Sequence, residues 1–306
     1  MAVVSTPERN ARRAVSQLVA PPERTRRERL FAGLLFVGTV VSVVVLAILL
    51  VDILIDGAGR LSLDFLTSYS SRFAERTGIR AGLTGTLSLM VLVGVIGFPI
   101  GVGAAVYLEE FAPDNRFTRL IEANIANLAA VPSVVYGLLG LGVFVYLLAP
   151  LTGGRSLLTG SITLALLILP VIIVASRESL RAVPRAIRDG GLALGATPLQ
   201  VAWRQLLPAA LPGILTGTIL SLSRAIGETA PILVAGAVGA RAADNEFWHP
   251  FEAFTALPIE IFGYVSRPQT DFKVDAASAA IIVLMVVLLL LNSAAILLRN
   301  RYSRRW

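Results

Sequence analysis

The sequence predicts an all-α protein that crosses a membrane about six times. Of its 306 residues, 55% are hydrophobic and only 15% are charged, whereas a soluble domain carries nearer a quarter charged residues. Six stretches are apolar over the roughly 20 residues that a membrane-spanning helix needs. Many of the basic residues gather beside the ends of these stretches, as they do in polytopic membrane proteins.

The first three predicted spans are residues 30–55, 82–108 and 120–149. The first follows a basic segment, but its apolar run is longer than the roughly 7–15 residues of a signal peptide, so we expect a retained helix. The second is rich in glycine. The third is long for one helix and is broken by Pro132, which removes a backbone donor from the helical ladder.

The last three predicted spans are residues 157–175, 211–238 and 276–298. Pro170 and Pro231 lie inside two of them, and each is expected to remove one backbone hydrogen bond and bend its helix. Such breaks are tolerated in a membrane where protein or a watery cavity satisfies the freed carbonyl. They favour a transporter or channel only weakly, because proline is common in membrane helices.

The basic residues also predict the orientation. With both termini in the cytoplasm, 18 of the 27 Lys and Arg residues lie inside and eight lie outside, while Arg224 lies within a span. Cytoplasmic termini are therefore expected. The predicted parts are a basic cytoplasmic N-terminal segment (1–29), a transmembrane domain (30–298) with a cytoplasmic connection (176–208) and an external loop (239–275), and a cytoplasmic tail (299–306).

Several chemistries are excluded by composition. The chain has no cysteine and one histidine, so a disulfide framework is excluded and a His/Cys metal site is not expected. Its one lysine, Lys273, does not follow a glycine-rich loop, so any ATP must be bound by a partner. No catalytic motif is present, and we expect neither enzymatic activity nor a cofactor in this chain. The net charge of +7 comes largely from membrane-flanking residues, and nucleic acid is not an expected partner.

The cytoplasmic connection contains a predicted helix–turn–helix. Gly195 follows a short helical stretch and suits a left-handed helix end. Thr197 and Pro198 then suit the cap and first position of a second helix. Two interpretations stay open from these residues alone: an ordinary amphipathic loop, or two short helices that meet at a glycine corner on the cytoplasmic side.

Charged residues inside apolar spans are the sharpest feature of the sequence. Arg224 and Glu228 lie four residues apart and are expected on one helical face, with Thr229 beside them. A charge at the bilayer centre costs about 3 kcal/mol or more, so the pair must face protein or water. Function is favoured over a self-neutralising pair that joins two helices, and both remain open. Glu122, near the start of the third span, is expected to hydrogen-bond between helices.

Four segments carry a resemblance to known permeases. Residues 189–208 resemble the EAA motif of ABC importer permeases, with Asp for Glu, two glycines for two alanines and Gln205 for Ile. Residues 223–233, Ser-Arg-Ala-Ile-Gly-Glu-Thr-Ala-Pro-Ile-Leu, resemble a signature of the PstA family of phosphate permeases. Residues 131–138 and 256–262 match the same family, so that the resemblance covers roughly residues 80–298.

The resemblance implies a type I ABC importer permease fold and phosphate import by alternating access across the inner membrane. It implies three kinds of partner besides the bilayer: a PstC-like second permease, two PstB-like ATPase subunits that bind ATP and Mg, and a PstS-like phosphate-binding protein. Another oxyanion such as sulfate or molybdate, and an ion-coupled secondary transporter, remain the alternatives. The implied site residues are Arg224, Glu228 and Thr229 on the substrate pathway, and Asp189, Gly190, Gly191, Ala193 and Gly195 at the ATPase contact.

Overall fold

A computed structural model describes residues 26–237 and 249–302 of the chain, and these contain helices and connections but no strand. The chain divides within its first long helix into two units, residues 1–52 and 53–306, and each is described by itself. The described part of the first unit belongs to α2 (Arg26–Ala58). Apolar side chains lie on all sides of this helix, which suits a lipid environment.

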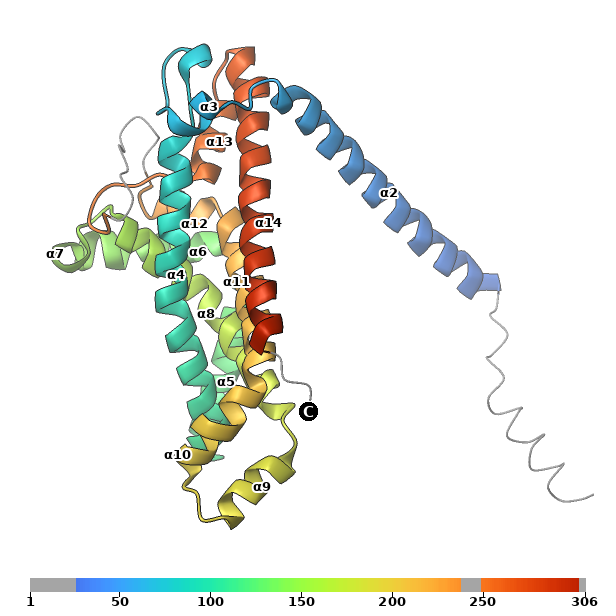
Figure 1. Ribbon diagram of the computed structural model, residues 1–306, viewed down its shortest axis with the longest axis vertical. Coiled ribbons are helices and arrows are strands. Elements are labelled where there is room, and N and C mark those ends of the chain that lie inside the picture. Colours follow the sequence, from blue (N-terminus) through green and yellow to red (C-terminus); the bar gives the residue numbers. More distant parts are fainter. Residues whose placement is uncertain (1–25, 238–248, 303–306) are drawn as a thin grey trace, which may run out of the picture. The chain divides into compact units, whose positions relative to one another are not determined.

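The second unit is built around four long helices that lie along a common axis (Figure 1). They are α4 (Arg80–Val106), α8 (Leu157–Arg181), α11 (Leu207–Gly227) and α14 (Ala277–Tyr302). α8 packs between α4 and α11, and α11 also packs on α14. Small residues allow close approach: a Cβ added at Gly217 would lie 2.3 Å from the Cβ of Ala175. Such contacts are typical of helix pairs in membranes.

Short π-helical turns lengthen three of these helices. α4 continues through the π-helical turn η2 (Tyr107–Phe111), and α14 is preceded by η5 (Phe272–Ala276). α11 is preceded by the short α-helix α10 (Pro198–Val201) and the π-helical turn η4 (Ala202–Leu206). Among the residues that the structure describes, five helices are long and apolar enough to cross a membrane, and a bent pair gives a sixth. The predicted fold class is therefore confirmed. The fifth span differs from its predicted bounds because the helix starts at Pro198 and ends at Gly227.

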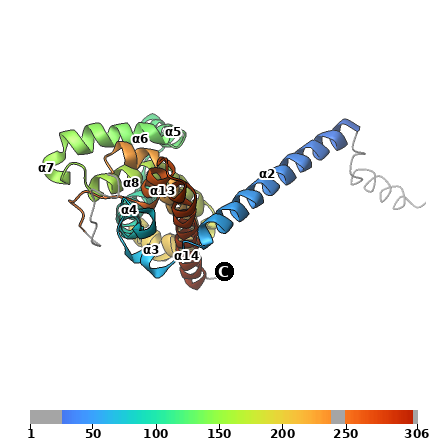
Figure 2. The same ribbon diagram turned by 90° about the horizontal axis from the view of Figure 1, so that it is seen from above.

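The bent pair is the predicted third span. α5 (Arg116–Leu128) is followed by α6 (Ser133–Leu139), which continues through η3 (Gly140–Leu147), and the two parts meet at 108°. Pro132 immediately precedes α6 and cannot donate to the ladder of a continuous helix. The predicted break is confirmed, and α6–η3 runs across the bundle towards α7 (Ala149–Thr152) (Figures 1 and 2).

Short helices lie at the two ends of the bundle (Figure 1). We call one end, with α3 (Leu63–Thr67), η1 (Ala74–Arg76) and α13 (Leu257–Val265), the α13 end. The other, with α9 (Arg185–Ala193), is the α9 end. At the α13 end the buried Tyr264 donates a hydrogen bond to the Gly78 carbonyl at 2.8 Å, which joins α13 to the segment before α4.

Glu260 is a buried carboxyl group in α13, between two spanning helices. One of its oxygens accepts a hydrogen bond from the Gly82 N–H at 3.1 Å. The other has no hydrogen-bond partner among the described residues. Burial raises the pKa of Glu260 to about 8, against an ordinary value of 4.5, because a charged carboxylate is poorly solvated there.

The raised pKa makes the stability of the protein depend on pH. Between about pH 4.5 and pH 8 the folded protein holds a proton on Glu260 that the unfolded chain has released. The free energy of unfolding should therefore fall as pH rises through this range, by at most about 1.4 kcal/mol per pH unit from this group. Thermal unfolding in detergent at several pH values measures the slope.

The slope should become flatter in Glu260→Gln and stay unchanged in Glu75→Gln, which alters an exposed glutamate at the same end. An unaltered slope in Glu260→Gln would show that folding does not raise the pKa of this carboxyl group.

Candidate functional site

Arg224 lies at the end of a helix that breaks inside the predicted fifth span. α11 ends at Gly227, Glu228 has extended backbone angles (φ −77°, ψ 115°), and α12 (Ala230–Val234) follows. Pro231 stands in the first turn of α12, where its missing N–H breaks no hydrogen bond. The prediction that Pro231 bends a continuous helix was therefore wrong. So was the prediction that Arg224 and Glu228 share one helical face, because the helix ends between them.

The two charged side chains nevertheless meet. Arg224 Nε lies 3.3 Å from Glu228 Oε1, with 55% of the arginine side chain exposed and 19% of the glutamate side chain exposed. The terminal nitrogens of Arg224 and the hydroxyl of Thr229 have no hydrogen bond to another described residue. The break thus presents a guanidinium group with donors to spare, beside a carboxylate and a hydroxyl group.

A hydrogen bond to α14 holds Ser223, the residue before Arg224. Ser223 Oγ hydrogen-bonds Asn292 Oδ1 of α14. Hydrogen bonds of this kind join helices within a membrane, where water does not compete for them. Asn292 was missed in the sequence, although an asparagine in an otherwise apolar span is a detectable signal.

The two broken spans contact each other. α6 packs on α12, and a Cβ added at Gly137 would lie 2.8 Å from the Cα of Pro231. The main chains therefore touch, which only glycine permits at position 137. The structure brings together residues 131–138 and 223–233, two of the segments that carry the resemblance.

The predicted helix–turn–helix forms the α9 end. α9 ends before Gly195, whose φ is +83°, and no heavy atom lies within 4 Å of a Cβ added there. Backbone conformation, not space, thus favours glycine at this corner. Thr197 and Gln200 form a reciprocal capping box at the start of α10, and Pro198 takes the first position. The predicted corner and its caps are confirmed.

Two departures from the EAA motif compensate for each other. Gly191 replaces an alanine and Gln205 replaces an isoleucine. In the fold, Gln205 Oε1 lies 2.5 Å from where a Cβ at position 191 would be, and Val201 Cγ2 lies 2.9 Å away. The glutamine side chain therefore occupies room that the missing methyl group leaves. The contact fixes α9 against the helical turn that leads into α11.

This packing gives a matched pair of predictions. We expect Gly191→Ala to lower the unfolding temperature, because the new methyl group must displace Gln205 or Val201. Gly190→Ala should be neutral or stabilising by up to about 1 kcal/mol, since alanine favours a helix and nothing lies within 4 Å. Differential scanning fluorimetry of the two purified variants measures both effects. Equal stability of the two would contradict the assigned contact.

An exposed apolar patch surrounds the corner. Leu194 is 89% exposed at its tip, and Leu192, Leu199 and Trp203 are exposed around it. Exposed apolar patches of this kind mark interaction surfaces. Of the predicted contact residues, Asp189, Gly190, Ala193 and Gly195 are exposed, whereas Gly191 faces its own chain. The sequence interpretation missed the apolar side chains, which are the larger part of the surface.

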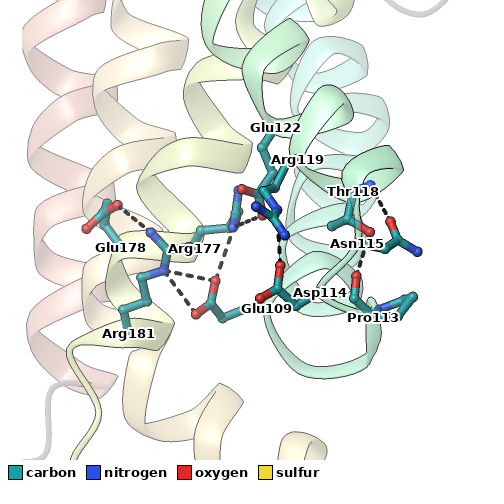
Figure 3. Close-up of polar contacts among 10 residues, drawn as sticks. All are labelled: Glu109, Pro113, Asp114, Asn115, Thr118, Arg119, Glu122, Arg177, Glu178 and Arg181. Atoms are coloured by element: carbon teal, nitrogen blue, oxygen red, sulfur yellow. Dashed lines mark hydrogen bonds and ion pairs between the residues drawn. The ribbon is translucent and has the colours of Figure 1, made fainter.

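A cluster of ion pairs connects three helices at the same end of the bundle (Figure 3). Glu109, in η2, accepts hydrogen bonds from Arg177 at 3.3 Å and from Arg181 at 3.0 Å, both in α8. Arg177 also donates to Glu122 of α5 at 2.5 Å. The expected interhelical role of Glu122 is confirmed. Glu109, Arg177 and Arg181 were not identified in the sequence because their partners lie 68 and 72 residues away.

Comparison with known sequences gives one family and several relatives. Residues 97–306 match the family of binding-protein-dependent transport system inner membrane components. The chain is 31% identical over 251 residues to the phosphate transport system permease protein PstA of Haemophilus influenzae, covering 81% of this chain and 86% of that one. It is 32% identical over 233 residues to the probable ABC transporter permease YqgI of Bacillus subtilis, covering 76% and 78%.

Solved structures share the fold at lower identity. A bacterial alginate ABC transporter matches with a TM-score of 0.62 and 15% identity, over 88% of this chain and 93% of that one. The inward-facing MetNI methionine ABC transporter matches with a TM-score of 0.60 and 20% identity, over 74% and 96%. At these identities the likeness establishes the type I permease fold and carries nothing about substrate.

Proposed function

Because the chain belongs to the family of binding-protein-dependent transport system inner membrane components, we propose that it is the PstA-like permease of a phosphate importer. The chain is a multi-pass membrane protein and an ABC importer permease. In the proposed complex it moves inorganic phosphate inward by alternating access. It forms the pathway with a PstC-like permease and carries out no chemistry itself.

The observation that carries the choice of substrate is the guanidinium group of Arg224 at the helix break, whose terminal nitrogens donate to no other described residue. Arginine presents a planar fork of donors that suits the oxygens of phosphate, and it stays charged when poorly solvated. Substrate sites of transporters are commonly formed at interrupted helices. Phosphate can also retain a proton that sulfate lacks. The carboxylate of Glu228, beside Arg224, can accept a hydrogen bond from that protonated oxygen. The names of relatives such as the Haemophilus permease favour phosphate over the other oxyanions.

The α9 end is the proposed contact with the ATPase subunits, which bind ATP and Mg. Its apolar corner, with Leu194 at the tip, would enter a groove of the ATPase. In this proposal the α9 end lies in the cytoplasm, and both termini lie there as the distribution of the basic residues predicts. The α13 end then faces outward, where a PstS-like binding protein delivers phosphate.

The test is reconstitution of the permease with its second permease, ATPase and binding protein in liposomes. We expect ATP-dependent uptake of labelled phosphate and ATPase activity that rises with phosphate-loaded binding protein. Uptake of sulfate or molybdate in place of phosphate would move the substrate assignment to another oxyanion. Uptake driven by an ion gradient without the ATPase would overturn the proposed importer.

A further inference from the structure

Two adjacent glutamates at the end of α4 point to different helices. Both belong to the π-helical turn η2. Glu109 forms ion pairs with Arg177 and Arg181 of α8, whereas Glu110 forms an ion pair with Arg188 of α9. One turn of the α4 helix is thus connected both to the transmembrane bundle and to the corner that would contact the ATPase.

The Glu110–Arg188 pair is well protected on the glutamate side. The Glu110 side chain is 9% exposed and that of Arg188 is 39% exposed. Separating the two would leave a desolvated carboxylate without its counter-ion, which is strongly unfavourable. Displacement of α9 is therefore expected to carry the end of α4 with it. Ile187, one residue before Arg188, also packs against the main core, so this part of α9 is held by both charge and apolar contact.

The connection continues from η2 towards the helix break. Glu109 contacts Arg177, and Arg177 contacts Glu122 of α5 (Figure 3). α5 leads through its 108° bend into α6, and α6 touches the main chain of α12 at Pro231. α12 begins next to Thr229. A contiguous series of contacts therefore joins α9 to the residues around Arg224.

We propose that Glu110 and Arg188 are positioning residues that transmit the movement of the ATPase-contacting corner to the substrate pathway. This inference rests on the proposed importer function and assigns the step between ATP hydrolysis and opening of the pathway. Spatial continuity alone does not establish such coupling. The decisive quantity is therefore the amount of phosphate moved per ATP hydrolysed, which a purely structural role would leave unchanged.

The experiment uses the full complex in liposomes and the double variant Glu110→Gln with Arg188→Gln. Removing both charges leaves no unpaired buried ion, so the complex should assemble. We expect it to hydrolyse ATP while its ratio of phosphate moved to ATP hydrolysed falls about 5-fold or more, the lower limit of common allosteric coupling. The charge-exchanged variant, Glu110→Arg with Arg188→Glu, should recover part of the ratio.

The matched control is Asp114→Asn, which removes an exposed ion pair with Arg119 near the same cluster. Its ratio should equal that of the unaltered complex. A wild-type ratio in the assembled double glutamine variant would overturn the proposal. A failure of the proposed function would be seen in a different measurement, as an absence of phosphate uptake by the unaltered complex.

Discussion

Arg224→Gln is expected to assemble into the complex, and its phosphate uptake is expected to fall about 10- to 100-fold. A fall of this size corresponds to the loss of one or two charge-assisted hydrogen bonds. The reason is its position at the helix break, where the guanidinium group has donors that no described residue uses. Uptake is measured in liposomes and normalised to the amount of assembled complex. Arg224→Lys should retain part of the activity, because it keeps the charge and loses the planar fork.

A double variant separates a substrate contact from a structural pair. If Arg224 serves only to neutralise Glu228, removing one partner leaves a poorly solvated charge, which costs up to about 3–5 kcal/mol when fully buried. Arg224→Gln combined with Glu228→Gln would then restore both assembly and transport. An assembled but inactive double variant supports the substrate contact. Transport at the wild-type rate by this variant would falsify it.

Leu194→Asp is expected to abolish co-purification of the ATPase with the permease. The leucine is 89% exposed at the tip of the corner, where an interface would bury it. A carboxylate at that point would be desolvated on binding, with a cost of several kcal/mol. The measurement is the ATPase recovered with a tagged permease from detergent extracts.

Leu63→Asp is the matched control for Leu194→Asp. Leu63 is 79% exposed and lies in α3, at the opposite end of the bundle (Figure 1). It should leave ATPase recovery unchanged. Recovery of normal amounts of ATPase with Leu194→Asp would show that the apolar corner is not the contact.

Much of the fold follows from local rules. Composition and the length of apolar runs predict the spans, because a bilayer requires about 20 apolar residues whatever the tertiary structure. Pro132 predicts the break in the third span because it has no N–H to donate. Gly195, Thr197 and Pro198 predict the corner at the α9 end, since a left-handed residue, a cap and a first-turn proline each act on neighbouring backbone.

The parts that were missed depend on residues far apart in the chain. The end of α11 at Gly227 accompanies the packing of α12 against Gly137, ninety residues earlier. In the sequence, Gly191 is only a weak helix former. That it makes room for the side chain of Gln205 is seen only in the fold, where the two residues lie side by side. Glu260 meets Gly82 over a separation of 178 residues. No pattern in a single sequence specifies such pairs.

The contact between Gly137 and Pro231 has a consequence for how such permeases diversify. A Cβ added at position 137 would lie 2.8 Å from the Cα of Pro231 and 3.1 Å from the Cβ of Val234, so this position has no room for a side chain that could be reshaped to admit a different anion. Any larger residue at position 137 would instead push apart both broken spans at once. Under the proposed function, changes of specificity during evolution, or by directed engineering, should therefore accumulate around Arg224, Glu228 and Thr229 and leave this glycine fixed.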